Sequence, residues 1–187
     1  MTLAKDDLDV SHVSGNAPDH IKRVLSNTTA FFANRQPDKI KGKIFAEDMQ
    51  KRFKVTEVSI LRKVEEPNKL EGRVVVELEV MKDMLNIRHG IHGGCSAALI
   101  DMCSTLALHA LVMYNSTDDY ISVSQTMNIV FHSPAALGDI LRLVNTTLTV
   151  GSRAHSASTE IWNVTHRRLV ASGVQIKMVP SELQTKM

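Results

Sequence analysis

A glycine pair followed by a lone acid is the feature of this sequence best suited to chemistry. His92-Gly93-Gly94 opens a stretch of small and aliphatic residues, and Asp101 is the only Asp, Glu, Lys or Arg between positions 93 and 113. A carboxylate in apolar surroundings is costly unless it is paired, hydrogen-bonded or used. Glycines at a helix entrance leave backbone N–H groups open to an anion or a carbonyl oxygen. Together the two features predict attack on a polarised carbonyl.

The elements around this stretch must hold the glycines and the acid in place. Residues 93–113 predict one long helix that is apolar nearly all round, so other elements must cover it on most sides. Runs of β-branched and alternating residues predict strands at 55–64, 70–81, 120–131, 139–150, 153–163 and 168–179. Short connections between the last three favour an antiparallel meander. The expected architecture is α+β, with a curled antiparallel sheet wrapped around a central helix.

Composition excludes several classes of function. Aromatic residues make up 4% of the chain and the formal net charge is +2, so no nucleic-acid partner is expected. No membrane span is expected either, because Asp101 and His109 interrupt the apolar stretch. Cys95 and Cys103 would lie about 12 Å apart on one helix, too far to bridge. They are interpreted as core residues in a reducing compartment, and no His/Cys cluster suggests a metal site.

The first part of the chain is interpreted as an extension, residues 1–50, that precedes the main domain at 51–187. Residues 1–18 are polar and predict a flexible arm, whereas the apolar spacing over 19–34 predicts a helix. A short helix is weakly indicated at 46–52. The acidic N-terminus lacks an apolar leader, which predicts a cytoplasmic protein. A mitochondrial address within residues 1–50 stays open.

A set of spaced residues resembles one known family. Asn86, His92-Gly93-Gly94 and Asp101 are followed by Ser124 and then by Ser133-Pro134-Ala135. This combination resembles the hotdog-fold acyl-CoA thioesterases, in the branch that contains the phenylacetate-pathway thioesterases and acyl-CoA thioesterase 13. The likeness covers about residues 53–179 and departs at His89, where the family usually carries glycine. It implies a hotdog fold and the hydrolysis of an acyl-CoA in lipid metabolism, with coenzyme A as part of the substrate and no other cofactor.

Helix geometry separates the donor from the acid. Eight residues of helix span about 12 Å along the axis, so one chain cannot present Gly93 and Asp101 to the same carbonyl. We therefore expect a two-fold homodimer with two equivalent sites at its interface. The family resembled is built from such dimers, often paired into tetramers, so a homotetramer is expected as well.

Roles follow from chemistry for two residues and from the resemblance for the others. The Gly93 N–H would hold the thioester oxygen as negative charge develops. Asp101 would activate a water as general base, with direct nucleophilic attack as the less favoured alternative. The resemblance implies that Ser124 helps to place the water and that Asn86 orients the carboxylate or the water. His92 is expected to shape the loop and donate or accept hydrogen bonds.

Three further residues are predicted to bind substrate. Gly94 adjoins the donor, while Arg153 and Lys177 lie where the family tends to place contacts to the CoA phosphates. Simpler interpretations remain open for the main motif: a structural acid, a tight turn before a helix, and an ordinary strand hydroxyl. Two other functions also remain open: a non-catalytic acyl-CoA or lipid-responsive binding module, and a hydratase or dehydratase, which the family pattern disfavours.

Overall fold

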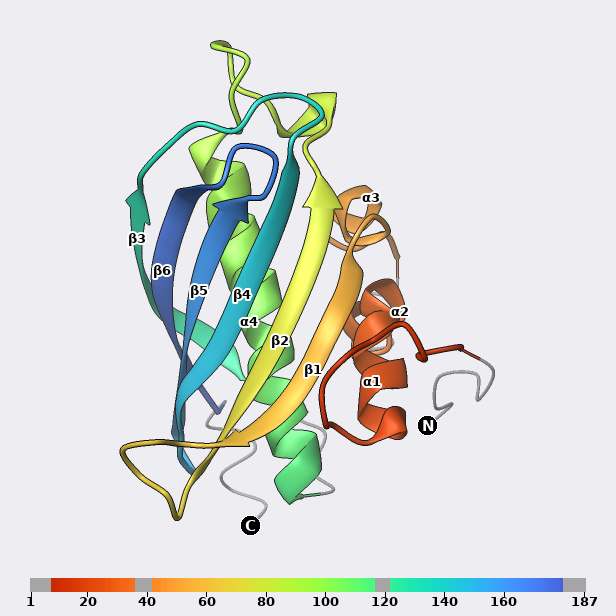
Figure 1. The fold of residues 1–187 in the computed structure, drawn as a ribbon, viewed down its shortest axis with the longest axis vertical. Helices are drawn as coiled ribbons and strands as arrows, with labels where there is room; N and C mark the ends of the chain where they lie inside the picture. The colour runs from red at the N-terminus through yellow and green to blue at the C-terminus, as the bar shows by residue number, and fades with distance from the viewer. Residues whose placement is uncertain (1–7, 36–41, 117–121, 180–187) are drawn as a thin grey trace.

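A six-stranded antiparallel sheet curls around one long helix, α4 (Figure 1). The computed structural model describes residues 8–35, 42–116 and 122–179. The strands lie in the order β1-β2-β4-β5-β6-β3, and all neighbouring pairs are antiparallel. Their bounds are β1 (Lys54–Arg62), β2 (Leu70–Glu79), β3 (Val123–Phe131), β4 (Ile140–Val150), β5 (Ala154–Asn163) and β6 (Arg168–Met178). The expected fold class and the meander β4–β5–β6 are confirmed.

The place of strand β3 in the sheet could not be predicted from the alternation of apolar residues in the sequence. It does not join its successor β4 but crosses to the far side and pairs with β6, which makes it an edge of the sheet. Its register shifts between Ser124 and Thr126. Sheet neighbours are chosen by long-range pairing, whereas alternation reports only which face of a strand is buried.

Helix α4 (Gly93–Asn115) is the central element of the core. Its close fit to the sheet depends on Gly72 in β2, because a Cβ built at that position would lie 2.6 Å from the Ala107 carbonyl oxygen. Among the described residues α4 alone is long and apolar enough to cross a membrane by length and composition. However, 78% of its most apolar window is buried inside the protein. The helix is therefore accounted for as a core helix.

The start of the chain is more ordered than its polarity suggests. The flexible arm predicted over residues 1–18 is wrong for residues 8–17, while residues 1–7 lie outside the described part. Ser14 forms a parallel bridge with Glu57 of β1. The Asn16 side chain donates to the Ile60 carbonyl (2.8 Å) and accepts from the Ile60 N–H (2.7 Å). Val13 is buried in the same core as the sheet. This segment thus covers the β1 edge, which would otherwise be unpaired.

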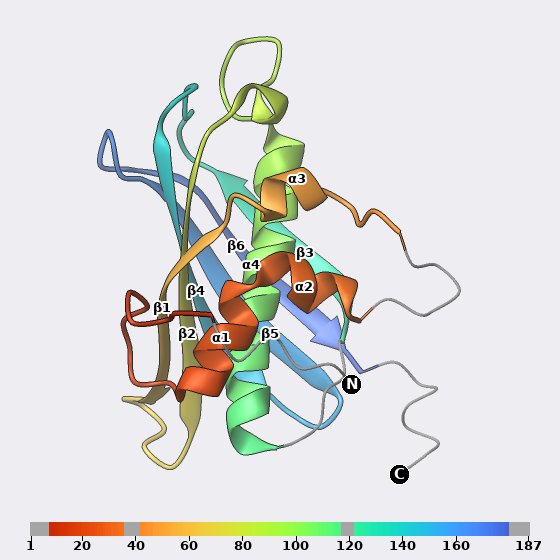
Figure 2. The same cartoon turned by 90° about the vertical axis from the view of Figure 1, so that its right-hand side faces the viewer.

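The single helix expected over 19–34 is two helices, α1 (Asp19–Ser26) and α2 (Thr28–Ala33). Asn27 separates them, and its side-chain oxygen accepts from the Ala30 N–H (3.2 Å) as the N-cap of α2. Figure 2 shows α1, α2 and the short α3 (Glu47–Gln50) crossing in front of α4, and Figure 1 places them beside the β1 edge of the sheet. A single 3₁₀ turn, η2 (Lys82–Met84), leads from β2 toward the loop before α4. Helices α1, α2 and α3, all within residues 19–50, therefore cover one side of the apolar helix α4.

Candidate active site

The loop before α4 is built by Asn86. The side-chain Oδ1 of Asn86 accepts hydrogen bonds from the backbone N–H groups of Arg88 (2.8 Å) and Gly90 (3.3 Å). The backbone N–H of Asn86 donates to the Gly90 carbonyl (2.8 Å). His89 has a φ of 61°, in the left-handed region that glycine adopts without strain. Within one chain Asn86 therefore acts as a turn residue. Its predicted role in orienting the carboxylate or the water stays a prediction.

At the start of α4 the capping pattern distinguishes Gly93 from Gly94. His92 Nδ1 accepts from the Gly94 N–H (2.9 Å), and the His92 carbonyl accepts from the N–H groups of Cys95 and Ser96 (2.9 and 3.0 Å). The Gly93 N–H has no acceptor among the described residues. Because Nδ1 accepts, His92 carries its ring proton on Nε2 when neutral. Gly93 is thus the open donor, and the Gly94 N–H is not available to a substrate.

Two polar side chains, from Ser124 and Gln175, converge on one oxygen of Asp101. Ser124 Oγ, from the edge strand β3, donates to Asp101 Oδ1 (2.7 Å). Gln175, from β6, donates through Nε2 to the same Oδ1 and also contacts Ser124 Oγ (2.8 Å). Ser104 Oγ donates to Gln175 Oε1, which orients the amide with its nitrogen toward the acid. Asp101 Oδ2 has no partner within the described part of the chain, and 42% of the side chain is exposed.

The structure corrects the prediction for Lys177. Its side chain is only 6% exposed, and Nζ donates to Thr105 Oγ1 (2.8 Å) and lies 3.8 Å from Asp101 Oδ1. Burial lowers the pKa of Lys177, and the nearby charge of Asp101 opposes that shift. Lys177 therefore faces the core beneath the acid and cannot reach a CoA phosphate. Its inward position on β6 explains the error, because alternate residues of a strand face opposite sides.

The structure places Ser124, predicted to help position the water, against Asp101, and adds Gln175, which the sequence interpretation missed. Gln175 is fully buried, and it lies two positions before Lys177 on the same face of β6. The available signal was a pair of polar residues at inward positions of a strand that otherwise buries apolar side chains. Arg153 is exposed in the turn before β5, so its predicted contact with CoA phosphates stays a prediction.

The donor and the acid do not meet within one chain. Gly93 opens α4 and Asp101 lies eight residues later on the same helix, which places them about 12 Å apart along the axis. No group of three or more His, Cys, Asp or Glu side chains that could hold a metal occurs in residues 8–35, 42–116 and 122–179. The arrangement offers an open backbone N–H, that of Gly93, at the start of α4 and a carboxylate, Asp101, held by two hydrogen bonds farther along the same helix. Each could serve a carbonyl, but not the same one.

Comparison with known proteins finds several thioesterases that are similar to this chain. The family model of the thioesterase superfamily matches residues 89–170. Human acyl-coenzyme A thioesterase 13 is 30% identical over 118 residues, which cover 63% of this chain and 81% of that protein. The crystal structure of zebra fish thioesterase superfamily member 2 matches with a TM-score of 0.62 at 22% identity, covering 83% of this chain and 96% of that one. A hypothetical thioesterase from Streptococcus pneumoniae, solved with coenzyme A, matches with a TM-score of 0.55 at 21% identity, over 70% and 87% of the two chains.

Proposed function

Because this chain belongs to the thioesterase superfamily, we propose that it hydrolyses an acyl-CoA thioester to a carboxylic acid and free coenzyme A. The observation that carries the proposal is the combination of an open N–H at Gly93 and a carboxylate, Asp101, held through a single oxygen. Two likenesses support the substrate class. The human relative is named an acyl-coenzyme A thioesterase, and the streptococcal structure contains coenzyme A.

The free oxygen of Asp101 suits a general base. Ser124 and Gln175 hold Oδ1, which leaves Oδ2 to accept a proton from water. The water oxygen bonds to the thioester carbon, and the carbonyl oxygen gains a negative charge stabilised by the Gly93 N–H at the positive end of α4. When the carbonyl re-forms, the C–S bond breaks and the CoA sulfur takes the electron pair. Asp101 then returns its proton to that sulfur, which yields the acid and the thiol.

A two-fold dimer would bring Asp101 of one subunit to Gly93 of the other. Strand β3 is an edge of the sheet and carries large exposed apolar side chains, including Val130 (50% exposed) and Phe131 (58% exposed). Edges and apolar patches of this kind favour pairing with another chain. The Phe131 ring lies beside Gly93, since a Cβ built on that glycine would be 3.5 Å from it. The proposed interface is therefore continuous with the donor and completes both sites.

Removal of the donor alone tests the mechanism. Gly93 is the first residue of α4, where proline is tolerated, and His92 has the extended backbone (φ −69°, ψ 134°) that a following proline requires. Gly93→Pro should therefore delete the N–H and keep the helix, and kcat should fall about 10²- to 10³-fold. Gly93→Ala retains the N–H, meets Phe131 only at ordinary contact distance, and serves as the matched control.

A mixing experiment tests the shared site. Gly93→Pro and Asp101→Asn chains should each have strongly reduced activity, and exchanged mixtures should regain part of the wild-type activity because one site of each hybrid dimer keeps both groups. No recovery after confirmed subunit exchange would contradict the shared site. Saturable acyl-CoA binding without thiol release by the wild-type protein would instead favour a non-catalytic binding module.

A further inference from the structure

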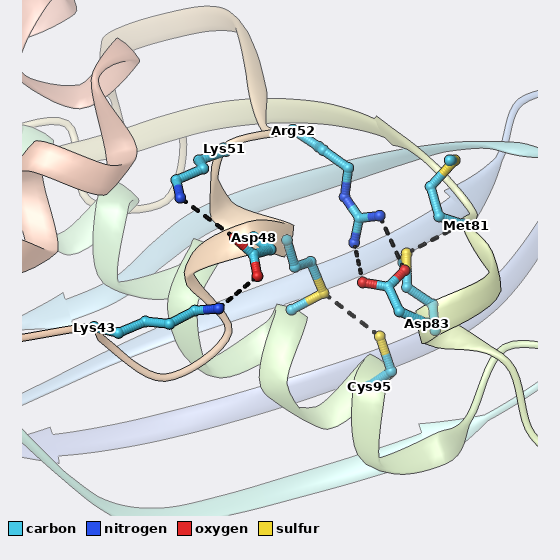
Figure 3. A network of polar contacts seen from close by, with 9 residues as sticks. Lys43, Asp48, Lys51, Arg52, Met81, Asp83 and Cys95 are labelled. Atoms are coloured by element: carbon cyan, nitrogen blue, oxygen red, sulfur yellow. Dashed lines mark hydrogen bonds and ion pairs between the residues drawn. The ribbon is translucent and has the colours of Figure 1, made fainter.

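A cavity of about 520 Å³ lies beside the start of α4, between the extension and η2. One wall comes from residues 43–49, which include the first three residues of α3, and another from residues 83–85. The third wall is the first two turns of α4. Figure 3 shows the polar contacts that border it. The segment 43–49 precedes the part of the chain that the thioesterase family model matches. Of the three walls, the one formed by residues 43–49 lies in the predicted extension, residues 1–50.

Every charged side chain that lines this cavity within the described part of the chain is already paired. Lys43 Nζ lies 2.7 Å from Asp48 Oδ2, and Glu47 Oε1 lies 2.6 Å from Lys51 Nζ. Asp83 accepts two hydrogen bonds from the Arg52 guanidinium, at 2.8 and 2.9 Å (Figure 3). Among residues 8–35, 42–116 and 122–179, the lining therefore offers no unpaired cation to a phosphate or a carboxylate. The paired side chains instead form a polar rim around the apolar part of the lining.

Apart from His92 and Gly94, the rest of the lining is apolar and adaptable. It consists of Phe45, Ala46, Met49, Met84, Leu85, Cys95 and Ala98. The Cys95 Sγ lies 3.6 Å from the Met49 Sδ (Figure 3), and burial raises the pKa of the Cys95 thiol to about 11. Cys95 is thus a neutral wall of the cavity. Methionine side chains can adjust to ligands of different shape, and a cavity of this volume is of the size that holds a small organic ligand.

The cavity lies beside the open backbone donor at the start of α4. His92 and Gly94 both line it, and the open Gly93 N–H lies between them in the chain. We infer that the cavity receives the acyl group of the substrate and selects uncharged aliphatic or aromatic acyl chains over those that end in a carboxylate. The inference rests on the proposed function, since a thioester oxygen bound at Gly93 is what brings the acyl group to the mouth of the cavity. The extension then sets acyl specificity.

Binding of non-hydrolysable analogues tests this separately from catalysis. The probes are S-butyl-CoA, S-octyl-CoA and S-(7-carboxyheptyl)-CoA thioethers, with affinities measured by calorimetry. Each methylene buried should improve affinity up to about fourfold, so octyl should bind at least tenfold more tightly than butyl. The carboxyheptyl probe should lose that gain, because its carboxylate would be buried without a partner.

Substitutions of residues that line the cavity test whether the tighter binding of the octyl probe depends on this cavity. Phe45 is 77% exposed and borders the cavity, so Phe45→Ala should fold normally and weaken octyl binding severalfold, with butyl binding unchanged. Ala98→Met should fill the cavity from the α4 side and have a larger effect of the same sign. Val64, 85% exposed in the β1–β2 turn, is apolar but outside the cavity, and Val64→Ala is the control.

The outcomes separate the two proposals. Equal affinities for butyl and octyl probes, or an octyl preference that survives both wall variants, would overturn the acyl cavity whether or not acyl-CoA thioesters are hydrolysed. A chain-length preference lost in Phe45→Ala and Ala98→Met supports it. If that preference is present while no acyl-CoA is hydrolysed, the cavity stands and the proposed hydrolysis fails.

Discussion

Replacement of Gln175 by leucine should impair catalysis without weakening substrate binding. Gln175 is fully buried and donates to both Asp101 Oδ1 and Ser124 Oγ, so it holds the acid without touching the substrate. A hydrogen bond to a charged group contributes about 1.5–3 kcal/mol. If that orientation is used in the transition state, Gln175→Leu should lower kcat about 10- to 150-fold. KM should change less than about twofold.

The same substitution should also destabilise the fold, so a control is needed to separate the two effects. In Gln175→Leu, Ser104 loses its contact with the Gln175 side chain and keeps only the Asp101 carbonyl at 3.3 Å, and the buried amide loses its own hydrogen bonds. The free energy of unfolding should therefore fall by about 1–3 kcal/mol. Asn145 provides the control because its side-chain amide is equally buried. It forms hydrogen bonds with Val74, Leu143 and Thr159 and none with Asp101. Asn145→Leu should cost similar stability in urea unfolding but leave kcat of the folded enzyme unchanged. If both variants keep wild-type kcat, or both lose it alike, Gln175 is only a structural residue.

Three further predictions concern acid sensitivity, packing and assembly. Burial lowers the pKa of His109 in the folded protein to about 3, whereas its pKa in the unfolded chain is near 6.5. As the pH falls below 6.5, the unfolded chain therefore takes up a proton that the folded protein does not, and the folded state loses stability. Unfolding at pH 5 should be easier than at pH 7 by about 2 kcal/mol from this group, and His109→Leu should remove that part of the loss. Gly72→Ala should lower the free energy of unfolding by about 1–3 kcal/mol, whereas Gly42→Ala, where an added Cβ meets nothing, should not; equal midpoints in urea would contradict the close fit. Val130→Lys should yield an inactive monomer in sedimentation velocity, and an active monomer would exclude the shared site.

The sequence alone determined the fold class and the acid. An apolar helix needs cover on most sides, and the alternating strands 139–150, 153–163 and 168–179 supply it, so the curled sheet followed from local patterns. Asp101 was identified because it is the one formal charge in that helix. The eight-residue spacing from Gly93 predicted two separate half-sites, since helix rise depends only on the chain itself.

Only the tertiary structure decided which side chains meet the acid and which donor stays open. Gln175 reaches Asp101, and Lys177 faces the core, because the pairing of β6 with β3 and β5 fixes where each side chain points. Gly93 rather than Gly94 is open because the His92 ring caps the helix. The cavity exists because residues 43–49 fold back beside α4. Spacing within one element is set by backbone geometry, whereas contacts between elements depend on register and packing across the whole chain.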